Sequence, residues 1–217
     1  MIHGGGWSSG DKADFNEYVD SVKKRLPDYA IFNINYRLAT GTANLFPTQE
    51  NDVKSAVEFI AGKFNEYNIS QKIVLLGASA GAHLALLQAY KQTSPIRPKA
   101  VIDFFGPTDI TELYNSSSSS LLLSLIVGAT PATNPDLYYQ SSPINFVTQQ
   151  SPPTIILQGG VDPLVFPSQS QALNEKLQTL GVVHQYVFYP AEGHGWFGAK
   201  LADSFDKLQT FLGNNVH

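Results

Sequence analysis

The stretch Gly77-Ala78-Ser79-Ala80-Gly81 has the pattern G-x-S-x-G and stands between an apolar run and a run of helix formers. The apolar run, residues 72–76, predicts a buried strand, and residues 82–90 predict a helix. A strand, a sharp turn and a helix together predict that the Ser79 hydroxyl is lifted clear of a sheet as a nucleophile. Glycine fits on both sides of the turn, because bulkier neighbours would clash there. A tight turn with a solvated serine is the alternative, since the pattern also arises by chance.

Outward from this turn, strand-like and helix-like stretches alternate along the chain. Apolar and β-branched runs predict further strands at residues 30–36, 100–105, 154–158 and 184–189. Apolar residues at helical spacing predict helices near residues 15–26, 53–64, 173–180 and 201–212. The alternation predicts one α/β domain over residues 1–217, with a doubly wound, mostly parallel sheet flanked by helices.

Residues 107–153 interrupt this alternation with a weaker pattern. Serines fill residues 116–120, residues 121–127 form a short apolar helix candidate, and prolines at 131, 135 and 143 predict turns. We expect this excursion to cross one end of the sheet as a small lid or a pocket wall. Leu122 and Leu125 are its candidate substrate-facing residues.

Composition excludes several classes of function. The chain of 217 residues has a net charge of −4, and no basic cluster exceeds Lys23-Lys24-Arg25, which argues against a nucleic-acid partner. No cysteine is present, which excludes disulfides, thiolate metal sites and a cysteine nucleophile but leaves the compartment open. No apolar run approaches the length of a membrane span, so a soluble protein is expected, cytoplasmic or secreted.

Three chemically active residues each come just after a predicted strand. Ser79, Asp162 and His194 should therefore meet, because the carboxyl ends of parallel strands share one edge of a sheet. A serine hydroxyl needs a base to become a nucleophile, and the base needs an orienting group. We expect His194, in the glycine-rich loop at residues 192–196, to be the base and Asp162 to be the acid.

The other histidines are expected to have different roles. His83 lies on the helix after the serine and His184 opens a strand, so both are predicted to be structural. His3 precedes three glycines and is expected to fix that loop, and His217 is terminal.

Other acids are rivals to Asp162. Asp109 follows a strand and is the alternative triad acid, whereas Asp103 lies inside a strand; Asp136 is a further rival. A turn-forming role before proline is the alternative for Asp162 itself.

Five short stretches occur in one order along nearly the whole chain: HGGGW at 3–7, NYRL at 35–38, GASAG at 77–81, GGVDPLV at 159–165 and EGHGW at 192–196. In this set the chain resembles the α/β-hydrolases of the esterase/lipase branch. The resemblance implies the α/β-hydrolase fold. It also implies an oxyanion hole made by the N–H groups of Gly5, Gly6 and Ala80, and a wall or positioning role for Trp7.

The function that the resemblance implies is that of a serine hydrolase with a catalytic triad. Such a carboxylesterase or lipase would cleave small or carbohydrate-linked acyl esters through an acyl-enzyme, without a metal or organic cofactor. Amide hydrolysis, as in formamidases or peptidases, is the alternative reaction. Ligand binding without catalysis is a third reading, which the intact set of Ser79, Asp162 and His194 argues against.

The start of the chain departs from the family pattern. In relatives a central strand leads into the HGGG stretch and two further strands precede it, whereas only Met1 and Ile2 stand before His3 here. A strand usually needs about five residues, so we expect a stub and no N-terminal edge strands. The exposed edge would be Ala30–Tyr36. We expect either that the chain is a shortened version of a longer protein or that this edge is covered by a partner, for example by a second copy in a homo-oligomer.

Overall fold

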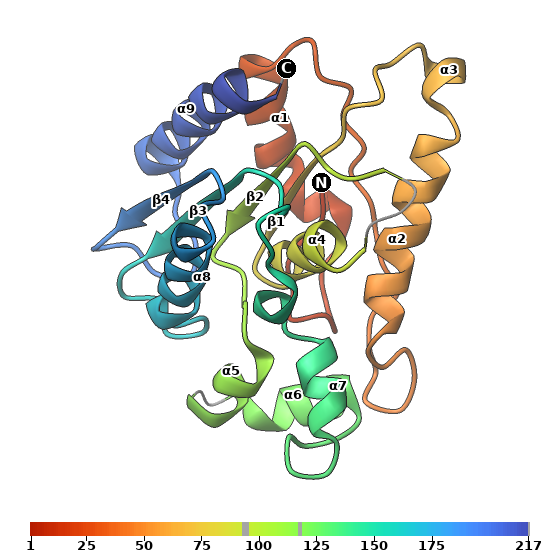
Figure 1. The fold of residues 1–217 in the computed structure, drawn as a ribbon, viewed down its shortest axis with the longest axis vertical. Helices are drawn as coiled ribbons and strands as arrows, with labels where there is room; N and C mark the ends of the chain where they lie inside the picture. The colour runs from red at the N-terminus through yellow and green to blue at the C-terminus, as the bar shows by residue number, and fades with distance from the viewer. Residues whose placement is uncertain (93–95, 117–118, 217) are drawn as a thin grey trace.

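The computed structural model describes residues 1–92, 96–116 and 119–216. Among them, four strands form a parallel sheet in the order β1 (Val74–Ala78), β2 (Ala100–Phe104), β3 (Thr154–Gly159) and β4 (His184–Tyr189). The register pairs Gly77 with Asp103 and Gly159 with Tyr189. Because the strands are parallel, their carboxyl ends lie along one edge of the sheet (Figure 1).

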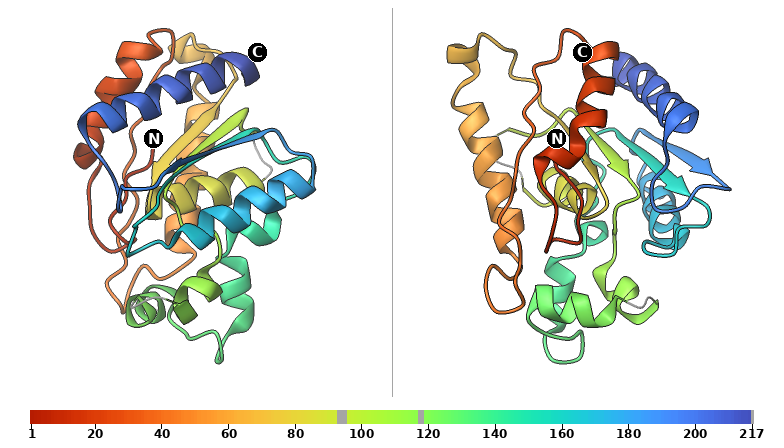
Figure 2. Two further views of the ribbon diagram at one scale, coloured as in Figure 1. Left: turned by 90° about the vertical axis from the view of Figure 1, so that its left-hand side faces the viewer. Right: turned by 180° about the vertical axis from the view of Figure 1, so that it is seen from behind.

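Helices cover both faces of the sheet, as the left view of Figure 2 shows. On one face lie α1 (Asn16–Arg25) and α9 (Gly198–Asn215), and on the other lie α2 (Thr48–Ala61), α4 (Ala80–Tyr90) and α8 (Pro167–Thr179). Alternate strand residues enter two separate apolar clusters, one on each face. A parallel sheet buried on both faces explains why its strands are continuous apolar runs in the sequence. The predicted α/β class is confirmed.

The predicted edge strand at residues 30–36 is wrong. In this segment the structure has an isolated bridge between Ile34 and Ile2, which in turn bridges to Gly77 of β1. The Ile2 amide donates to the Leu76 carbonyl at 2.9 Å, and the Ile34 amide donates to the Met1 carbonyl at 3.1 Å. The segment therefore meets the sheet through one bridge to Ile2, and a single bridge does not make a ladder.

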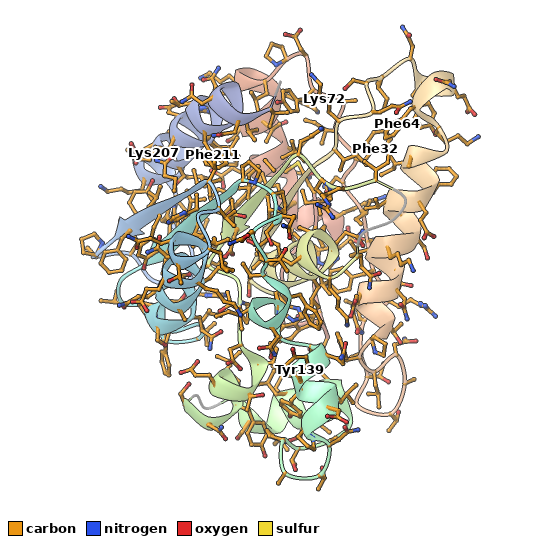
Figure 3. The ribbon with its side chains drawn as sticks, in the orientation of Figure 1. Phe32, Phe64, Lys72, Tyr139, Lys207 and Phe211 are labelled. Carbon is orange, nitrogen blue, oxygen red and sulfur yellow. The ribbon has the colours of Figure 1, made fainter. Side chains whose placement is uncertain are left out.

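A cavity of about 470 Å³ lies beside the segment at residues 30–36. Its lining is mostly apolar and comes from residues 29–34, residues 72–76 and helices α1, α2 and α9. Figure 3 shows Phe32, Phe64 and Lys72, which line this cavity, near the top of the molecule and Tyr139 near the bottom. Ser79, Asp162 and His194 do not line the cavity, so it is not the space in which a substrate would reach them.

The excursion at residues 107–153 is mostly helical. It contains α5 (Ile110–Ser116), α6 (Ser120–Val127) and α7 (Pro135–Gln140), which are grouped at one end of the molecule (Figure 1), and the short helix η2 (Pro143–Phe146), which packs against α4. The turns predicted at prolines 135 and 143 are wrong, because each proline begins a helix, where its missing N–H has no partner to lose. Ser117 and Ser118 of the serine run lie outside the described residues.

Two shorter elements complete the described fold, the helix η1 (Lys12–Phe15) before α1 and α3 (Phe64–Tyr67) after α2. Within the described ranges, no helix has both the length and the apolar character needed to cross a bilayer.

Candidate active site

Ser79 lies at the turn between β1 and α4 in a backbone conformation that L-residues rarely adopt. Its φ is 54° and its ψ is −123°. The Ser79 amide donates to the Phe104 carbonyl at 2.8 Å, and the Ser79 carbonyl accepts from the His83 amide at 3.0 Å. A conformation of this kind costs roughly 1–3 kcal/mol and persists only where the surroundings impose it, which is typical of functional sites.

Two glycines give this turn its room. A Cβ at Gly77 would lie 2.2 Å from the Gly81 carbonyl oxygen, and a Cβ at Gly81 would lie 2.1 Å from the Ile2 carbonyl oxygen. Both distances are far inside van der Waals contact, so a larger residue would displace the backbone. The predicted reason for glycine at both positions is confirmed.

His194 hydrogen-bonds to both Ser79 and Asp162. Its Nε2 lies 2.9 Å from Ser79 Oγ, and its Nδ1 lies 2.7 Å from Asp162 Oδ2. The three residues follow β4, β1 and β3 respectively, so the shared edge of the parallel sheet brings them together. A carboxylate can only accept, so Nδ1 carries the proton and Nε2 is free to accept the proton of the serine hydroxyl.

The carboxylate of Asp162 is held by its own turn. Its Oδ1 accepts from the amides of Leu164 and Val165 at 2.9 and 3.0 Å. Its Oδ2 also accepts from Gln158 Nε2 at 3.3 Å, and Ser170 Oγ donates to Gln158 Oε1 at 2.8 Å. Asp162 therefore both stabilises its own turn and hydrogen-bonds to His194, so the two alternatives for this residue do not exclude one another. Gln158 was missed by sequence reasoning, although a glutamine inside an apolar strand was its signal.

The rival acids lie elsewhere. Asp109 accepts from the Glu112 amide at 2.9 Å in the first turn of α5, and Asp136 lies in the first turn of α7. Asp103 is fully buried within β2, where it accepts from the Gly106 amide at 2.7 Å. Burial raises the pKa of Asp103 to about 7.

The glycine loop packs directly against the serine turn. A Cβ at Gly4 would lie 3.4 Å from Ser79 Cβ, so the loop approaches within contact distance. Gly5 and Gly6 have φ values of 107° and 56°, and the Gly5 carbonyl accepts from the Ser9 amide at 2.9 Å. Successive residues of this kind form backbone concavities that suit an anion. Gly5, Gly6 and Ala80 as oxyanion donors stay a prediction.

His3 and Tyr36 hold the start of this loop. The two rings stack with centroids 4.4 Å apart. The Tyr36 hydroxyl donates to the carbonyls of Gly4 and His3, at 3.1 and 3.2 Å. These contacts fit the predicted role of His3. Tyr36 belongs to the NYRL stretch, but its contact with this loop was not predicted, because a tyrosine in an apolar run predicts only a strand.

Trp7 lies in the core. Its side chain is buried, and its Nε1 donates to His83 Nδ1 at 3.0 Å. Of its two predicted roles, wall and positioning, these contacts fit only positioning. His184 lies at the amino end of β4 with its Nδ1 2.7 Å from the Val182 carbonyl, away from Ser79, and His217 lies outside the described residues.

Aromatic residues anchor the loop that carries His194. The Phe105 ring packs against His194 at 4.8 Å and against Trp196 at 5.3 Å between centroids. Trp196 Nε1 donates to Ser204 Oγ on α9 at 2.8 Å. The imidazole is therefore supported on one side by a cluster tied to α9. The supporting contacts of Phe105 and Trp196 were not predicted, although Trp196 belongs to the EGHGW stretch, because apolar residues at these places predict only core.

The two candidate pocket residues on α6 have different surroundings. Leu122 Cδ2 lies 3.5 Å from the position that a Cβ would take at Gly6, so this half-exposed side chain borders the glycine loop. Leu125 is also half-exposed but lies against Gly41 instead. In the described part of the chain, no group of three or more His, Cys, Asp or Glu side chains is arranged to hold a metal ion.

A parallel sheet covered by helices, with Ser79, His194 and Asp162 hydrogen-bonded at its carboxyl edge, defines an α/β-hydrolase of the esterase/lipase branch. The chain belongs to the family described as BD-FAE, whose model matches residues 1–177.

Relatives carry esterase names. The chain is 25% identical over 210 residues to Esterase LipQ and 29% identical over 192 residues to Probable carboxylic ester hydrolase LipM, both of Mycobacterium tuberculosis. These alignments cover 90% and 82% of this chain but 49% and 44% of the relatives, so the chain spans about half the length of these curated relatives. A solved structure described as a truncated form of carbohydrate esterase from gut microbiota superposes with a TM-score of 0.82 at 25% identity, covering 96% of this chain and 84% of that chain.

Proposed function

We propose that this chain is a serine carboxylesterase that cleaves esters through an acyl-enzyme. The observation that carries the proposal is that His194 hydrogen-bonds to Ser79 on one side and to Asp162 on the other. Ser79 is the nucleophile, His194 the general base and acid, and Asp162 the group that fixes the imidazole tautomer.

The reaction runs in two halves. Ser79 Oγ attacks the ester carbonyl while His194 Nε2 takes its proton, and the N–H groups of Gly5, Gly6 and Ala80 stabilise the oxyanion. The tetrahedral intermediate collapses as His194 returns the proton to the leaving alcohol, which leaves the acyl group on Ser79. Water, deprotonated by His194, then attacks the acyl-enzyme, and His194 returns the proton to Ser79 Oγ as the bond to the acyl carbon breaks and the acid leaves.

We propose small or carbohydrate-linked acyl esters as the substrate class. Similarity to the carbohydrate esterase of gut microbiota supports the carbohydrate part. The excursion at residues 107–153 would form a small lid or pocket wall over the site within one domain. The position of Leu122 beside Gly6 supports a pocket wall there, whereas Leu125 lies beside Gly41.

Ser79→Ala tests the proposal. Alanine keeps the Cβ that the turn already accommodates and removes the hydroxyl, so we expect an unchanged unfolding midpoint. Turnover of p-nitrophenyl acetate should fall by at least about four orders of magnitude, as in other hydrolases that lose their nucleophile. Labelling by a fluorophosphonate should disappear in the same variant. Near-normal turnover, or labelling of another residue, would overturn the assignment.

Amide hydrolysis uses the same residues and differs in the leaving group. Comparing kcat/KM for p-nitrophenyl acetate and p-nitroacetanilide separates the two reactions, and we expect the ester to be preferred. A chain that binds these esters without cleaving them would support ligand binding instead.

Self-association through residues 30–36 is a separate proposal. It is supported by a segment that pairs through a single bridge and carries half-buried apolar side chains at Ile31, Phe32 and Ile34. Light scattering of the wild type and of Phe32→Glu tests it. A monomeric wild type would contradict this proposal and leave the esterase assignment untouched.

A further inference from the structure

One buried imidazole joins three segments of the chain that are far apart in the sequence. Trp7 Nε1 donates to His83 Nδ1 at 3.0 Å, and His83 Nε2 lies 2.7 Å from the Ser141 carbonyl oxygen. Trp7 ends the HGGGW loop, His83 lies on α4 four residues after Ser79, and Ser141 follows α7 of the excursion. All three residues are buried, so the two hydrogen bonds are made away from solvent.

The partners fix the protonation of this imidazole. An indole N–H can only donate and a carbonyl oxygen can only accept. His83 must therefore accept at Nδ1 and donate at Nε2, which is one tautomer of the neutral ring. Burial, helped by the charge of Lys91, lowers the pKa of His83 to about 4, although the bond to the Ser141 carbonyl opposes the shift. The ring thus stays neutral at the pH values where an esterase is assayed.

Trp7 needs such an anchor because of its backbone. Gly5, Gly6 and Trp7 all have positive φ, and the value at Trp7 is 58°. Glycine adopts this region freely, but another L-residue costs roughly 1–2 kcal/mol there. The Trp7 carbonyl accepts from the Ala39 amide at 2.9 Å, and its indole is held by His83. These two contacts fix the far end of the loop whose N–H groups would face the substrate.

We propose that His83 is a positioning residue for the oxyanion loop. Through Trp7 it keeps the peptide groups of Gly5 and Gly6 aligned with Ser79, and through Ser141 it ties the excursion to the same helix. Its kinetic consequence rests on the proposed function. The oxyanion forms only as Ser79 attacks. Misaligned donors therefore reduce the stabilisation of the transition state more than they reduce the affinity for the substrate. A misplacement of about 1 Å can cost about 100-fold in rate.

The kinetic test uses two substitutions at one position. His83→Leu removes both hydrogen bonds, whereas His83→Gln keeps one acceptor and one donor. We expect kcat for p-nitrophenyl acetate to fall by about 10- to 100-fold in His83→Leu with little change in KM, and to recover largely in His83→Gln. His184→Gln, at the opposite end of the sheet, is the matched control and should change neither constant.

A double-substitution cycle separates positioning from general packing. Trp7→Phe removes the indole donor. If His83 acts through Trp7, Trp7→Phe combined with His83→Leu should cost no more than the larger single loss. Losses that multiply, or a His83→Leu enzyme with unchanged kcat, would overturn the proposal. If His83→Leu fails to fold, Trp7→Phe alone tests the proposal, because it removes the same hydrogen bond from the other side. Its kcat should fall by about 10- to 100-fold with little change in KM, and an unchanged kcat would overturn the proposal.

A second readout does not depend on turnover. The chain has two tryptophans, so two indole N–H signals are expected in a ¹⁵N-labelled sample. We expect the Trp7 signal to exchange slowly with solvent in the wild type and in His83→Gln, and rapidly in His83→Leu. If the wild type cleaves no ester but the three proteins show this pattern of exchange, the proposed function alone is contradicted. Normal turnover with an unchanged Trp7 signal in His83→Leu contradicts the positioning role alone.

Discussion

At the scale of single residues, the turn at Ser79 is constrained from two sides. The Phe104 carbonyl of β2 accepts a hydrogen bond from the Ser79 amide, and the Ile2 carbonyl lies so close to Gly81 that no Cβ would fit there. The same contact links the serine turn to the residues that lead into the glycine loop. A change at Gly81 should therefore disturb the nucleophile and the oxyanion donors together.

Gly81→Ala is expected to lower both stability and activity. The added Cβ would lie 2.1 Å from the Ile2 carbonyl oxygen and 2.4 Å from the His3 carbonyl oxygen, and backbone cannot move aside as a flexible side chain can. We expect a loss of about 1–3 kcal/mol in the free energy of unfolding. Urea unfolding and esterase turnover measure the two effects.

Gly213→Ala is the matched control for this substitution. Gly213 lies exposed in α9, and a Cβ there would meet nothing within 4 Å. Alanine should therefore stabilise the helix by about 0.5–1 kcal/mol and leave turnover unchanged. Equal effects at positions 81 and 213 would show that the close approach at Gly81 is unimportant.

The candidate triad could be predicted because each member follows a strand of one parallel sheet. Supporting residues could not be predicted in the same way. Tyr36 acts through carbonyls more than 30 residues away, and Trp7 acts through an imidazole 76 residues away. Their residue types are common in cores, so only the folded arrangement distinguishes a supporting contact from ordinary packing.

At the scale of elements, periodicity located the four strands and the main helices correctly, and it failed where neighbours decide the outcome. Residues 30–36 have the composition of a strand but pair through only one bridge. Composition alone could not predict this, because a strand also needs a neighbour with which to form a ladder. Prolines 135 and 143 predict turns in isolation but begin helices here. The excursion these helices form brings α6 against the glycine loop.

Leu122→Ala is expected to change acyl-length preference. Leu122 Cδ2 lies 3.5 Å from the position that a Cβ would take at Gly6, whereas Leu121, the adjacent residue of α6, is 72% exposed. Each methylene of a longer acyl chain that packs against Leu122 is worth about 0.8 kcal/mol, or roughly fourfold in affinity. We therefore expect the ratio of kcat/KM for p-nitrophenyl butyrate over acetate to fall by about 3- to 10-fold in Leu122→Ala.

Leu121→Ala removes the same atoms from a side chain that faces solvent, and its ratio should stay that of the wild type. An unchanged ratio in Leu122→Ala, or the same shift in both variants, would place the acyl pocket elsewhere.

At the scale of the whole molecule, two buried ionisable groups should make stability depend on pH in opposite directions. Burial raises the pKa of Asp103 to about 7, so the folded state holds this proton more tightly than the unfolded chain. Burial lowers the pKa of His83 to about 4, so the folded state excludes a proton that the unfolded chain would bind. Asp103 Oδ2 has no hydrogen-bond partner among the described residues, which fits a carboxyl that is neutral when buried.

The signs follow from proton linkage. The contribution of Asp103 is fully present below its unfolded pKa of about 4 and is lost as pH rises toward 7. The contribution of His83 is present above its unfolded pKa of about 6.5 and is lost as pH falls toward 4. Between about pH 4 and 6.5 the two slopes therefore oppose one another, and their sum should be small.

Asp103→Asn should reveal the pH dependence of the free energy of unfolding that His83 contributes and that Asp103 offsets in the wild type. Asparagine keeps an oxygen for the Gly106 amide and cannot ionise, so only the His83 term remains of the two. We expect the free energy of unfolding of this variant to rise by about 1 kcal/mol for each pH unit between 4.5 and 6.5, relative to the wild type. His83→Gln should show a relative slope of similar size and opposite sign. Urea unfolding at several pH values measures both differences. Parallel curves for the wild type and Asp103→Asn would mean that Asp103 is ionised in the folded state across this range.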